Sequence, residues 1–269
     1  MPRPKLGQHW LQDRRICARI ARAVKLAEDE TCIEIGGGKG ALTRELAGRC
    51  RRLIVYEIDP RWAEHLREHG MRWGEGVEVR EGDALRIEWS REALDVQSDE
   101  PLVVTGNLPY YLASPLLLRL AYSRLDFRRA VVLIQKEVAE RIASKPGDSA
   151  YGRLTVSLRA FSVSELLFNV PPEAFKPPPR VTSTLIRLTP LVEPLVEAGW
   201  DEKWERTVES AFAMRRKTLK NNLRTGYPDI PVERIDAMLE QLGINPKARA
   251  QELDVGMIAK LMRLLGEES

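Results

Sequence analysis

Four consecutive residues, Asn107-Leu108-Pro109-Tyr110, could together hold and activate an exocyclic amine of a nucleobase. Such a nitrogen is a poor nucleophile because its lone pair is delocalised into the ring. Hydrogen-bond acceptors on its two N–H bonds make that lone pair more available. The side-chain oxygen of Asn107 and the backbone carbonyl of Leu108 are two such acceptors, and Pro109 restricts Leu108 to an extended conformation. Tyr110 adds a flat face for base stacking, worth about 1–3 kcal/mol.

A second aromatic candidate, Phe175, lies in the segment AFKPPPRVTST. The run of three prolines after it stiffens this loop and can hold the ring in place. We therefore expect Phe175 to lie opposite Tyr110, so that the two rings sandwich an extruded base.

The segment EIGGGKGA follows a short apolar strand and opens a helix. Glycines at such a turn let backbone amides approach a ligand closely at the carboxyl end of a parallel strand. Gly36-x-Gly38-x-x-Ala41 also fits the relaxed dinucleotide-binding fingerprint, with Glu57 at about the ~20-residue distance expected for an acid that binds ribose. A nicotinamide-dependent oxidoreductase is therefore a competing interpretation. A P-loop is excluded, because Lys39 is followed by glycine.

Acidic or amide side chains end three successive predicted strands: Glu57, Asp83 and Asn107. Ligands in open α/β sheets bind at this edge. Glu57 can accept both ribose hydroxyls, and Asp83 can accept from an adenine amino group. Asp59 before Pro60 is interpreted instead as a helix cap. The set favours an adenosine ligand without phosphates, namely S-adenosylmethionine, because a nicotinamide enzyme leaves Asp83 and the Asn-Leu-Pro-Tyr segment without a role.

The elements that must position these residues alternate between strand and helix. A helix is predicted over 13–26, and residues 152–163 fit either state. Predicted strands cover 31–36, 52–59, 77–84, 101–107 and 129–135, with two more over 165–171 and 180–190. Strands rich in β-branched residues that alternate with helices indicate a mostly parallel sheet, and the last two strands suit an antiparallel edge.

Beyond Pro190 the sequence predicts helices only, over 202–213, 217–223, 232–242 and 255–265. We therefore expect an α/β domain over 1–190, which begins with a basic arm, and a small all-helical domain over 191–269. The second domain carries Arg215, Arg216, Lys217 and Lys220 in a stretch free of acids, and another basic cluster lies in the first helix region. Two such clusters raise the prospect of a polyanionic partner, although either alone could be a solvated helix face.

Composition narrows the class of protein. A content of 43% hydrophobic and 30% charged residues is typical of a folded globular chain. No apolar run approaches the roughly 20 residues that span a bilayer, and the basic N-terminus lacks the apolar stretch of a signal peptide. Cys17, Cys32 and Cys50 form no Cys-x-x-Cys pair. We expect reduced thiols, no metal site, no membrane contact and a cytoplasmic monomer.

At these motifs the sequence resembles the KsgA-type ribosomal RNA adenine dimethyltransferases over nearly its whole length. The similar segments are GQHWLQD, EIGGGKGALT, NLPYY, IQKEVAERI, YGRLTV, FKPPPRVTS and AFAMRRKTLKNNL. The resemblance implies a Rossmann-like class I methyltransferase domain followed by a small helical domain that contributes to RNA binding. It also implies conversion of two adjacent adenosines near the 3′ end of small-subunit (16S) ribosomal RNA to N6,N6-dimethyladenosine, with S-adenosylhomocysteine as the other product.

The resemblance further assigns cofactor contacts. His9 and Leu11 would touch S-adenosylmethionine, Gly36 would lie under its methionine portion, and Glu57, Asp83 and Asn107 would bind ribose, adenine and the region of the methyl group. His9 and Trp10 depart from the asparagine and phenylalanine of the family motif. Tyr111 falls at a variable position of the family and is interpreted as a packing residue.

Three alternatives stay open at this point. A related methyltransferase acts on large-subunit ribosomal RNA, and Leu108 together with the triple proline favours the small-subunit type. A nicotinamide dehydrogenase would use the glycine loop differently. A non-catalytic ribosome assembly factor would depend on the basic clusters and not on Asn107.

Overall fold

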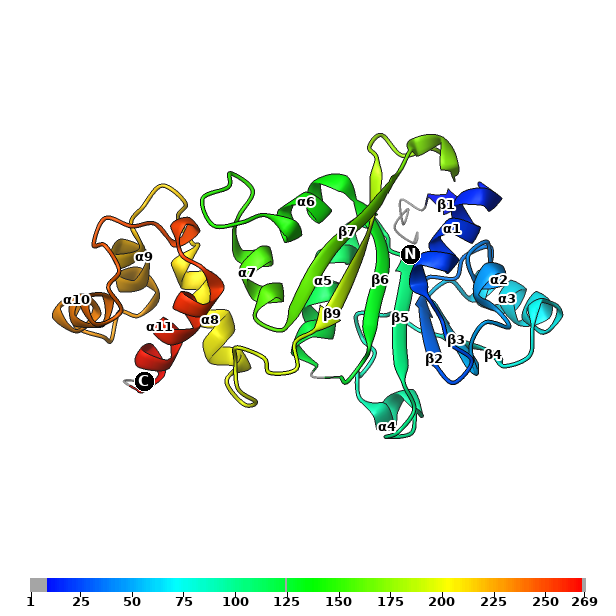
Figure 1. Cartoon of the computed structure of the whole chain (residues 1–269), viewed down its shortest axis with the longest axis horizontal. Helices are drawn as coiled ribbons and strands as arrows, with labels where there is room; N and C mark the ends of the chain where they lie inside the picture. Colours follow the sequence, from blue (N-terminus) through cyan, green and yellow to red (C-terminus); the bar gives the residue numbers. More distant parts are fainter. Residues whose placement is uncertain (1–8, 124, 268–269) are drawn as a thin grey trace, which may run out of the picture. The chain divides into compact units, whose positions relative to one another are not determined.

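The strands expected between residues 31 and 135 all form and lie in one sheet of the structure, a computed structural model that describes residues 9–123 and 125–267. Seven strands follow the order β4-β3-β2-β5-β6-β9-β7 (Figure 1). They are β2 Thr31–Ile35, β3 Arg52–Glu57, β4 Val77–Glu81, β5 Leu102–Asn107, β6 Arg129–Gln135, β7 Ser162–Val170 and β9 Ser183–Pro190. The strands from β4 to β6 pair in parallel, and β9 runs antiparallel to β6. The predicted α/β fold with a mostly parallel sheet and an antiparallel edge is confirmed.

The central strands are buried on both faces, which explains why their sequences read as continuous apolar runs. On β6, Val131 and Leu133 point to one face while Val132 and Ile134 point to the other, and all four are at most 1% exposed. Helices follow the strands along the chain. They are α2 Thr43–Leu46, α3 Pro60–Trp73, α4 Arg91–Leu94, α5 Tyr110–Tyr122 and α6 Lys136–Ala143.

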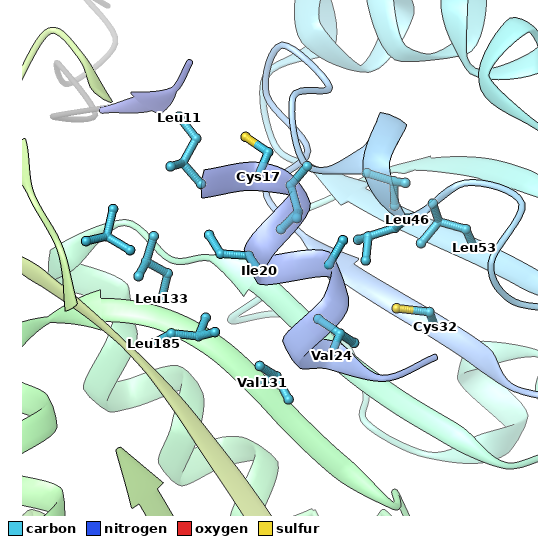
Figure 2. Packing of buried hydrophobic residues seen from close by; sticks show 14 of the residues in the cluster. Leu11, Cys17, Ile20, Val24, Cys32, Leu46, Leu53, Val131, Leu133 and Leu185 are labelled. Atoms are coloured by element: carbon cyan, nitrogen blue, oxygen red, sulfur yellow. The ribbon is translucent and has the colours of Figure 1, made fainter. Parts of the chain in front are cut away.

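The helix α1, Arg14–Val24, lies on the sheet through one apolar stripe. Cys17, Ile20 and Val24 repeat at helical spacing and belong to one buried cluster with Val131, Leu133 and Leu185 of the sheet (Figure 2). Asp13 caps the helix by accepting hydrogen bonds from the amides of residues 15 and 16. The opposite side of α1 is thereby turned toward solvent.

The predicted cap at the start of α3 is also confirmed. Asp59 precedes the helix in an extended conformation, its carboxylate accepts from the Arg61 amide, and Pro60 occupies the first helical position. This cap fixes the point at which the chain leaves β3 directly after Glu57.

A two-stranded antiparallel sheet joins the N-terminal motif to the proline-rich loop. It pairs β1, Trp10–Leu11, with β8, Phe175–Lys176, and Leu11 lies opposite Phe175. The short 3-10 helix η1, Pro172–Ala174, precedes β8, and the Ala174 carbonyl accepts from the amides of Gln12 and Asp13. Segments more than 160 residues apart in sequence are thus brought side by side.

The chain divides into two compact units. Unit 1 contains residues up to Ala139 and Ser164–Pro190, and unit 2 contains Glu140–Val163 together with the chain after Pro190. One division falls after Pro190, and Glu140–Val163 groups with the chain that follows it. Residues 153–159, which the sequence left undecided, form helix α7 (Arg153–Arg159).

Unit 2 is helical, as expected. Besides α7 it contains α8 Asp201–Ala211, α9 Leu219–Gly226, α10 Val232–Gln241, the 3-10 helix η2 Ala250–Glu252 and α11 Val255–Glu267. Its interior holds Trp204 at 0% exposure, and the buried Thr207 hydroxyl is 2.8 Å from the Tyr227 hydroxyl. Within the described residues, no helix is both long and apolar enough to cross a membrane.

Candidate active site

The carboxyl ends of β2, β3, β4 and β5 border a pocket that is open to solvent, at the edge of the sheet where ligands of open α/β folds bind. Every residue predicted from sequence for the cofactor or catalytic site lines this pocket, except Leu11. The predicted residues that line it are His9, Gly36, Glu57, Asp83, Asn107, Leu108, Pro109, Tyr110 and Phe175. Leu11 is 4% exposed, belongs to the hydrophobic core, and lines a smaller adjoining cavity instead.

Glu57 links the second strand of the site to the glycine loop. Its Oε2 accepts from the Gly38 amide at 2.8 Å and its Oε1 accepts from the Asp59 amide at 2.9 Å. Each carboxylate oxygen keeps a further lone pair, so the side chain can still accept from two hydroxyls on a ligand. Gly38 has a φ of +51°, and a Cβ there would lie 3.0 Å from the Trp10 ring. Glycine is therefore favoured at this turn.

Glu34 places an additional carboxyl beneath the same loop. It is 1% exposed on β2, and its Oε2 has no hydrogen-bond partner among the described residues. Burial raises its pKa to about 7; the nearby Thr43 hydroxyl opposes this shift and the charge of Glu57 adds to it. The Thr43 hydroxyl does not reach hydrogen-bond geometry and is itself unpartnered within the described chain.

Glu34 lines a small cavity beside the glycine loop. Trp10, Leu11, Lys39 and Asn107 line this cavity together with the glycine loop. It shares Trp10, Gly36, Gly38 and Asn107 with the main pocket. A cation bound beside the loop would therefore lie close to the carboxyl of Glu34, although Oε2 itself is closed off from solvent.

Asp83 follows β4, and one of its carboxylate oxygens is occupied by a hydrogen bond within the turn that it starts. Its Oδ1 accepts from the Leu85 amide at 3.0 Å, and its Oδ2 lies 3.8 Å from Nε of the exposed Arg86. The side chain is 29% exposed and lines the pocket. Oδ2 can therefore accept a hydrogen bond from a ligand.

The carboxamide of Asn107 is oriented by the N-terminal motif. Its Nδ2 donates to the backbone carbonyl of His9 at 3.0 Å. Because a carbonyl oxygen can only accept, this bond fixes which end of the amide is nitrogen and leaves Oδ1 as an acceptor in the pocket. Oδ1 is therefore the free end of the Asn107 carboxamide.

The His9 ring belongs to the aromatic side of the pocket. Its Nδ1 donates to the Pro177 carbonyl at 2.8 Å, and its centroid lies 5.7 Å from that of Tyr110. The ring is therefore engaged by the proline-rich loop and by Tyr110, while the backbone of His9 supports Asn107.

The rest of the Asn-Leu-Pro-Tyr segment is anchored on both sides. Leu108 is 1% exposed, and its amide donates to the Leu133 carbonyl at 3.1 Å. Pro109, with φ −54° and ψ 134°, directly precedes α5. The Tyr110 hydroxyl lies 3.0 Å from Ser183 Oγ, and burial raises the pKa of this phenol. The segment is consequently held rigidly between β5 and α5.

Two aromatic side chains from the small β1–β8 sheet complete the wall. Phe175 is 4% exposed and lines the pocket together with Tyr110. Trp10 lies over the glycine loop, with its ring centroid 5.8 Å from that of Trp62 and 4.7 Å from Lys39 Nζ. The proline-rich loop and the N-terminal motif therefore reach the pocket as one unit.

The interpretation of Tyr111 as a packing residue is wrong. Its side chain is 56% exposed and lines the pocket next to Asp83. Burial of part of the ring and the charge of Asp83 raise its pKa. Tyr111 lies in the first turn of α5, so it points to solvent at the pocket mouth and not into the core.

Sequence reasoning also missed Trp10 and Glu34. The available signal for Glu34 was a lone carboxyl inside the otherwise apolar strand TCIEI, a position where an unpaired charge is costly. Trp10 offered no local signal, because its position depends on the pairing of β1 with β8.

The predicted RNA-binding residues lie in unit 2. Arg215, Arg216 and Lys217 are exposed in the loop between α8 and α9, and Arg215 donates to the Ser149 carbonyl. Lys220 differs, because α9 places its ammonium 2.7 Å from the Asp236 carboxylate. In the part of the chain that the structure covers, no three His, Cys, Asp or Glu side chains form a possible metal site.

Comparison with known proteins agrees with this geometry. The family profile described as ribosomal RNA adenine dimethylase matches residues 2–267. A protein of Acidobacterium capsulatum named ribosomal RNA small subunit methyltransferase A is 41% identical over 99% of this chain and 92% of its own. The protein of the same name from Geobacillus thermodenitrificans is 38% identical over 97% of this chain and 89% of its own.

Two solved structures are similar over almost the whole chain. A dimethyladenosine transferase from Plasmodium falciparum superposes with a TM-score of 0.82 at 28% identity, covering 97% of this chain and 98% of that one. The 23S rRNA methyltransferase ErmE superposes with a TM-score of 0.69 at 31% identity, covering 96% and 99%. With the profile match and these relatives, the chain belongs to the ribosomal RNA adenine dimethylase family.

Proposed function

We propose that this protein uses S-adenosylmethionine to dimethylate N6 of two adjacent adenosines near the 3′ end of small-subunit (16S) ribosomal RNA. The observation that carries the proposal is the position of Asn107. Its free carboxamide oxygen lies in one pocket with two carboxylates, Glu57 and Asp83, and two aromatic residues, Tyr110 and Phe175. A donor nucleoside and an acceptor base could therefore meet at Asn107. The names of the relatives in Acidobacterium and Geobacillus support the small subunit as the target.

The cofactor side fits a cationic adenosine derivative. Glu57 can accept from the ribose hydroxyls, and Asp83 Oδ2 from the adenine amine. Gly36 lines the pocket and has no side chain, so the backbone of the glycine loop can approach the ligand closely. When bound, S-adenosylmethionine supplies a methyl group already activated on a sulfonium.

Glu34 makes this fit specific. The pocket and the adjoining cavity lack a donor for Glu34 Oε2 among the described residues, and burial raises the pKa of this carboxyl to about 7. An ammonium group placed beside the glycine loop would pair with it and favour its ionised form. We infer that Glu34 contributes to holding the amino-acid portion of the cofactor.

On the acceptor side, the residues hold and orient the adenine amine. Asn107 Oδ1 and the Leu108 carbonyl accept hydrogen bonds from the two N–H groups of this amine. These hydrogen bonds make the nitrogen lone pair more available. Tyr110 and Phe175 hold the flipped base by stacking. The N6 proton can leave after transfer, so the site works by positioning and electrostatics and needs no strong general base.

The partner that follows is the small ribosomal subunit, which the protein would meet as a monomer in the cytoplasm. The exposed loop of Arg215, Arg216 and Lys217 would bind RNA phosphates from unit 2. Lys220 would contribute less to RNA binding, because its ammonium group already pairs with the Asp236 carboxylate.

The direct test is methylation of immature small subunits that lack this modification. We expect the purified protein and labelled S-adenosylmethionine to label small-subunit RNA on adenine N6. Asn107→Ala should abolish labelling while subunit binding stays within about twofold, because Asn107 touches the amine and not the RNA backbone. Full activity of this variant would reject the proposed mechanism.

Two other outcomes would point to different functions. Labelling confined to large-subunit RNA would assign the protein to the ErmE-like type of activity. Saturable binding of NAD without binding of S-adenosylmethionine would identify a nicotinamide enzyme and overturn the proposal entirely.

A further inference from the structure

We propose that the outward face of α1 is a phosphate-binding row that holds the RNA strand next to the target adenosine. This inference rests on the proposed function and extends it to a surface outside the pocket. The row consists of Arg15, Arg19 and Arg22, which are all exposed.

Helical geometry sets the three arginines in a line. They follow one another at i, i+4 and i+7, which places them directly opposite the buried stripe of Cys17, Ile20 and Val24. With a rise of about 1.5 Å per residue, the Cα atoms of successive arginines lie about 6 and 4.5 Å apart along the helix axis. This face carries no acidic side chain, since the nearest acids are the cap Asp13 before the helix and Glu28 after it.

The charges of this row are not compensated by the protein. Throughout the chain ranges 9–123 and 125–267, no carboxylate pairs with Arg15, Arg19 or Arg22. Many other arginines of unit 1 do have such partners; Arg52, Arg80 and Arg129 are examples. Arg19 is instead held by stacking, with its guanidinium carbon 3.8 Å from the Phe168 ring centroid.

Part of the row works against the helix that carries it, whereas Arg22 in the last turn is placed favourably for the helix dipole. Like charges at i, i+4 and i, i+3 repel each other on a helix surface. Arg14 and Arg15 occupy the first turn, where the helix dipole disfavours cations and where no acid is present. Residues that cost local stability without an internal partner are expected at functional sites, and a polyanion would remove both penalties.

The position of α1 relative to the pocket identifies which phosphates are involved. The two residues before the helix, Gln12 and Asp13, donate their amides to the Ala174 carbonyl, next to the pocket residue Phe175. Trp10, three residues before Asp13, lines the pocket itself. The row therefore starts beside the aromatic wall and leads away from it, as the backbone of a strand with one base inserted in the pocket would do.

The test compares two charge-matched double variants. Arg15→Gln with Arg22→Gln removes two members of the row and leaves the Arg19–Phe168 contact. Arg67→Gln with Arg72→Gln removes two exposed charges from α3 and serves as the control. Binding of small subunits is measured across a series of salt concentrations, together with S-adenosylmethionine binding, kcat, KM and thermal unfolding.

For the row variant, we expect weaker subunit binding, on the order of tenfold or more at about 0.1 M salt, and a log–log salt slope shallower by about 1.5, because each phosphate contact contributes about 0.7–0.9. KM for the subunit should rise, while kcat and cofactor affinity stay unchanged. The midpoint of thermal unfolding should stay the same or increase, because repulsion on α1 is relieved. The control variant should change none of these quantities.

The inference is overturned if the row variant binds subunits with unchanged affinity and slope, or if the control variant is weakened equally. A loss of binding that accompanies a lower unfolding midpoint would assign the arginines a structural role instead. Failure of the proposed function can be distinguished from failure of this inference, because the unaltered protein would then label no small-subunit RNA at all.

Discussion

Replacing Glu34 by glutamine removes a buried carboxyl whose ionisation the free protein tolerates poorly. The pKa of Glu34 is about 7, against an ordinary value of 4.5. The unfolded chain therefore ionises this group from about pH 4.5 upward, whereas the folded chain resists ionisation until about pH 7. Stability contributed by the neutral carboxyl is complete below pH 4.5 and is lost progressively as the pH rises toward 7.

The magnitude follows from the two pKa values. Their difference of about 2.5, at about 1.4 kcal/mol per pH unit, corresponds to roughly 3–4 kcal/mol of destabilisation well above pH 7. Between pH 5 and pH 8 the linkage relation gives a change of roughly 2–3 kcal/mol for this single group. Glutamine has a similar shape and no charge, so Glu34→Gln should remove this pH dependence.

The assay is urea unfolding of both proteins without cofactor at pH 5 and at pH 8. Constant effects of the substitution, such as an unpartnered amide, cancel when the two pH values are compared. Relative to the unaltered protein, Glu34→Gln should gain about 2–3 kcal/mol in free energy of unfolding on going from pH 5 to pH 8. An equal difference at both pH values would refute the burial argument, and a relative loss at pH 8 would reverse its sign.

Further predictions concern the ligand, the base, the sheet and the basic loop. Binding of S-adenosylmethionine, measured by calorimetry, should weaken as the pH falls below about 7. The Glu34→Gln variant should bind the cofactor more weakly than the unaltered protein at pH 8, and its affinity should depend little on pH. An unchanged affinity would mean that Glu34 does not contact the ligand. Tyr110→Ala should lower kcat/KM about 5- to 150-fold through lost stacking, whereas Tyr110→Phe, which loses only the contact with Ser183, should lower it much less; equal losses would argue against stacking. Gly106→Ala should destabilise the fold by about 1–3 kcal/mol in urea unfolding, because its Cβ would lie 2.5 Å from the Ile35 carbonyl oxygen of the neighbouring strand; wild-type stability would contradict the close approach of β5 and β2. Neutralising Arg215, Arg216 and Lys217 together should weaken subunit binding with a shallower salt slope, and an unchanged slope would make this loop an ordinary solvated surface.

The parallel sheet could be predicted because its signals are local. β3, β5 and β6 are apolar runs that end in an acid or amide, β4 alternates valine with charged residues, and the parallel order places the strand ends at one edge. Glu57, Asp83 and Asn107 therefore reach one pocket as the sequence led us to expect. The antiparallel edge at β9 could also be read from two late strands that flank a proline-rich loop.

The rest of the site depends on contacts between distant segments. The pairing of Leu11 with Phe175 places Trp10 over the glycine loop and buries Leu11 in the core, and no local pattern encodes that pairing. Tyr111 was misjudged because two adjacent tyrosines at a helix start face different directions, one toward Ser183 and the other toward solvent. Residues 153–159 were ambiguous because a short apolar run with alternating polar residues satisfies both helix and strand spacing.

The central claim is tested most directly by mass analysis of small-subunit ribosomal RNA from cells with and without this protein. We predict two adjacent N6,N6-dimethyladenosines near the 3′ end in cells that contain it. In cells that lack it, or that carry Asn107→Ala, both positions should be unmodified adenosine. Identical modification in the presence and absence of the protein, or a change confined to large-subunit RNA, would contradict the account.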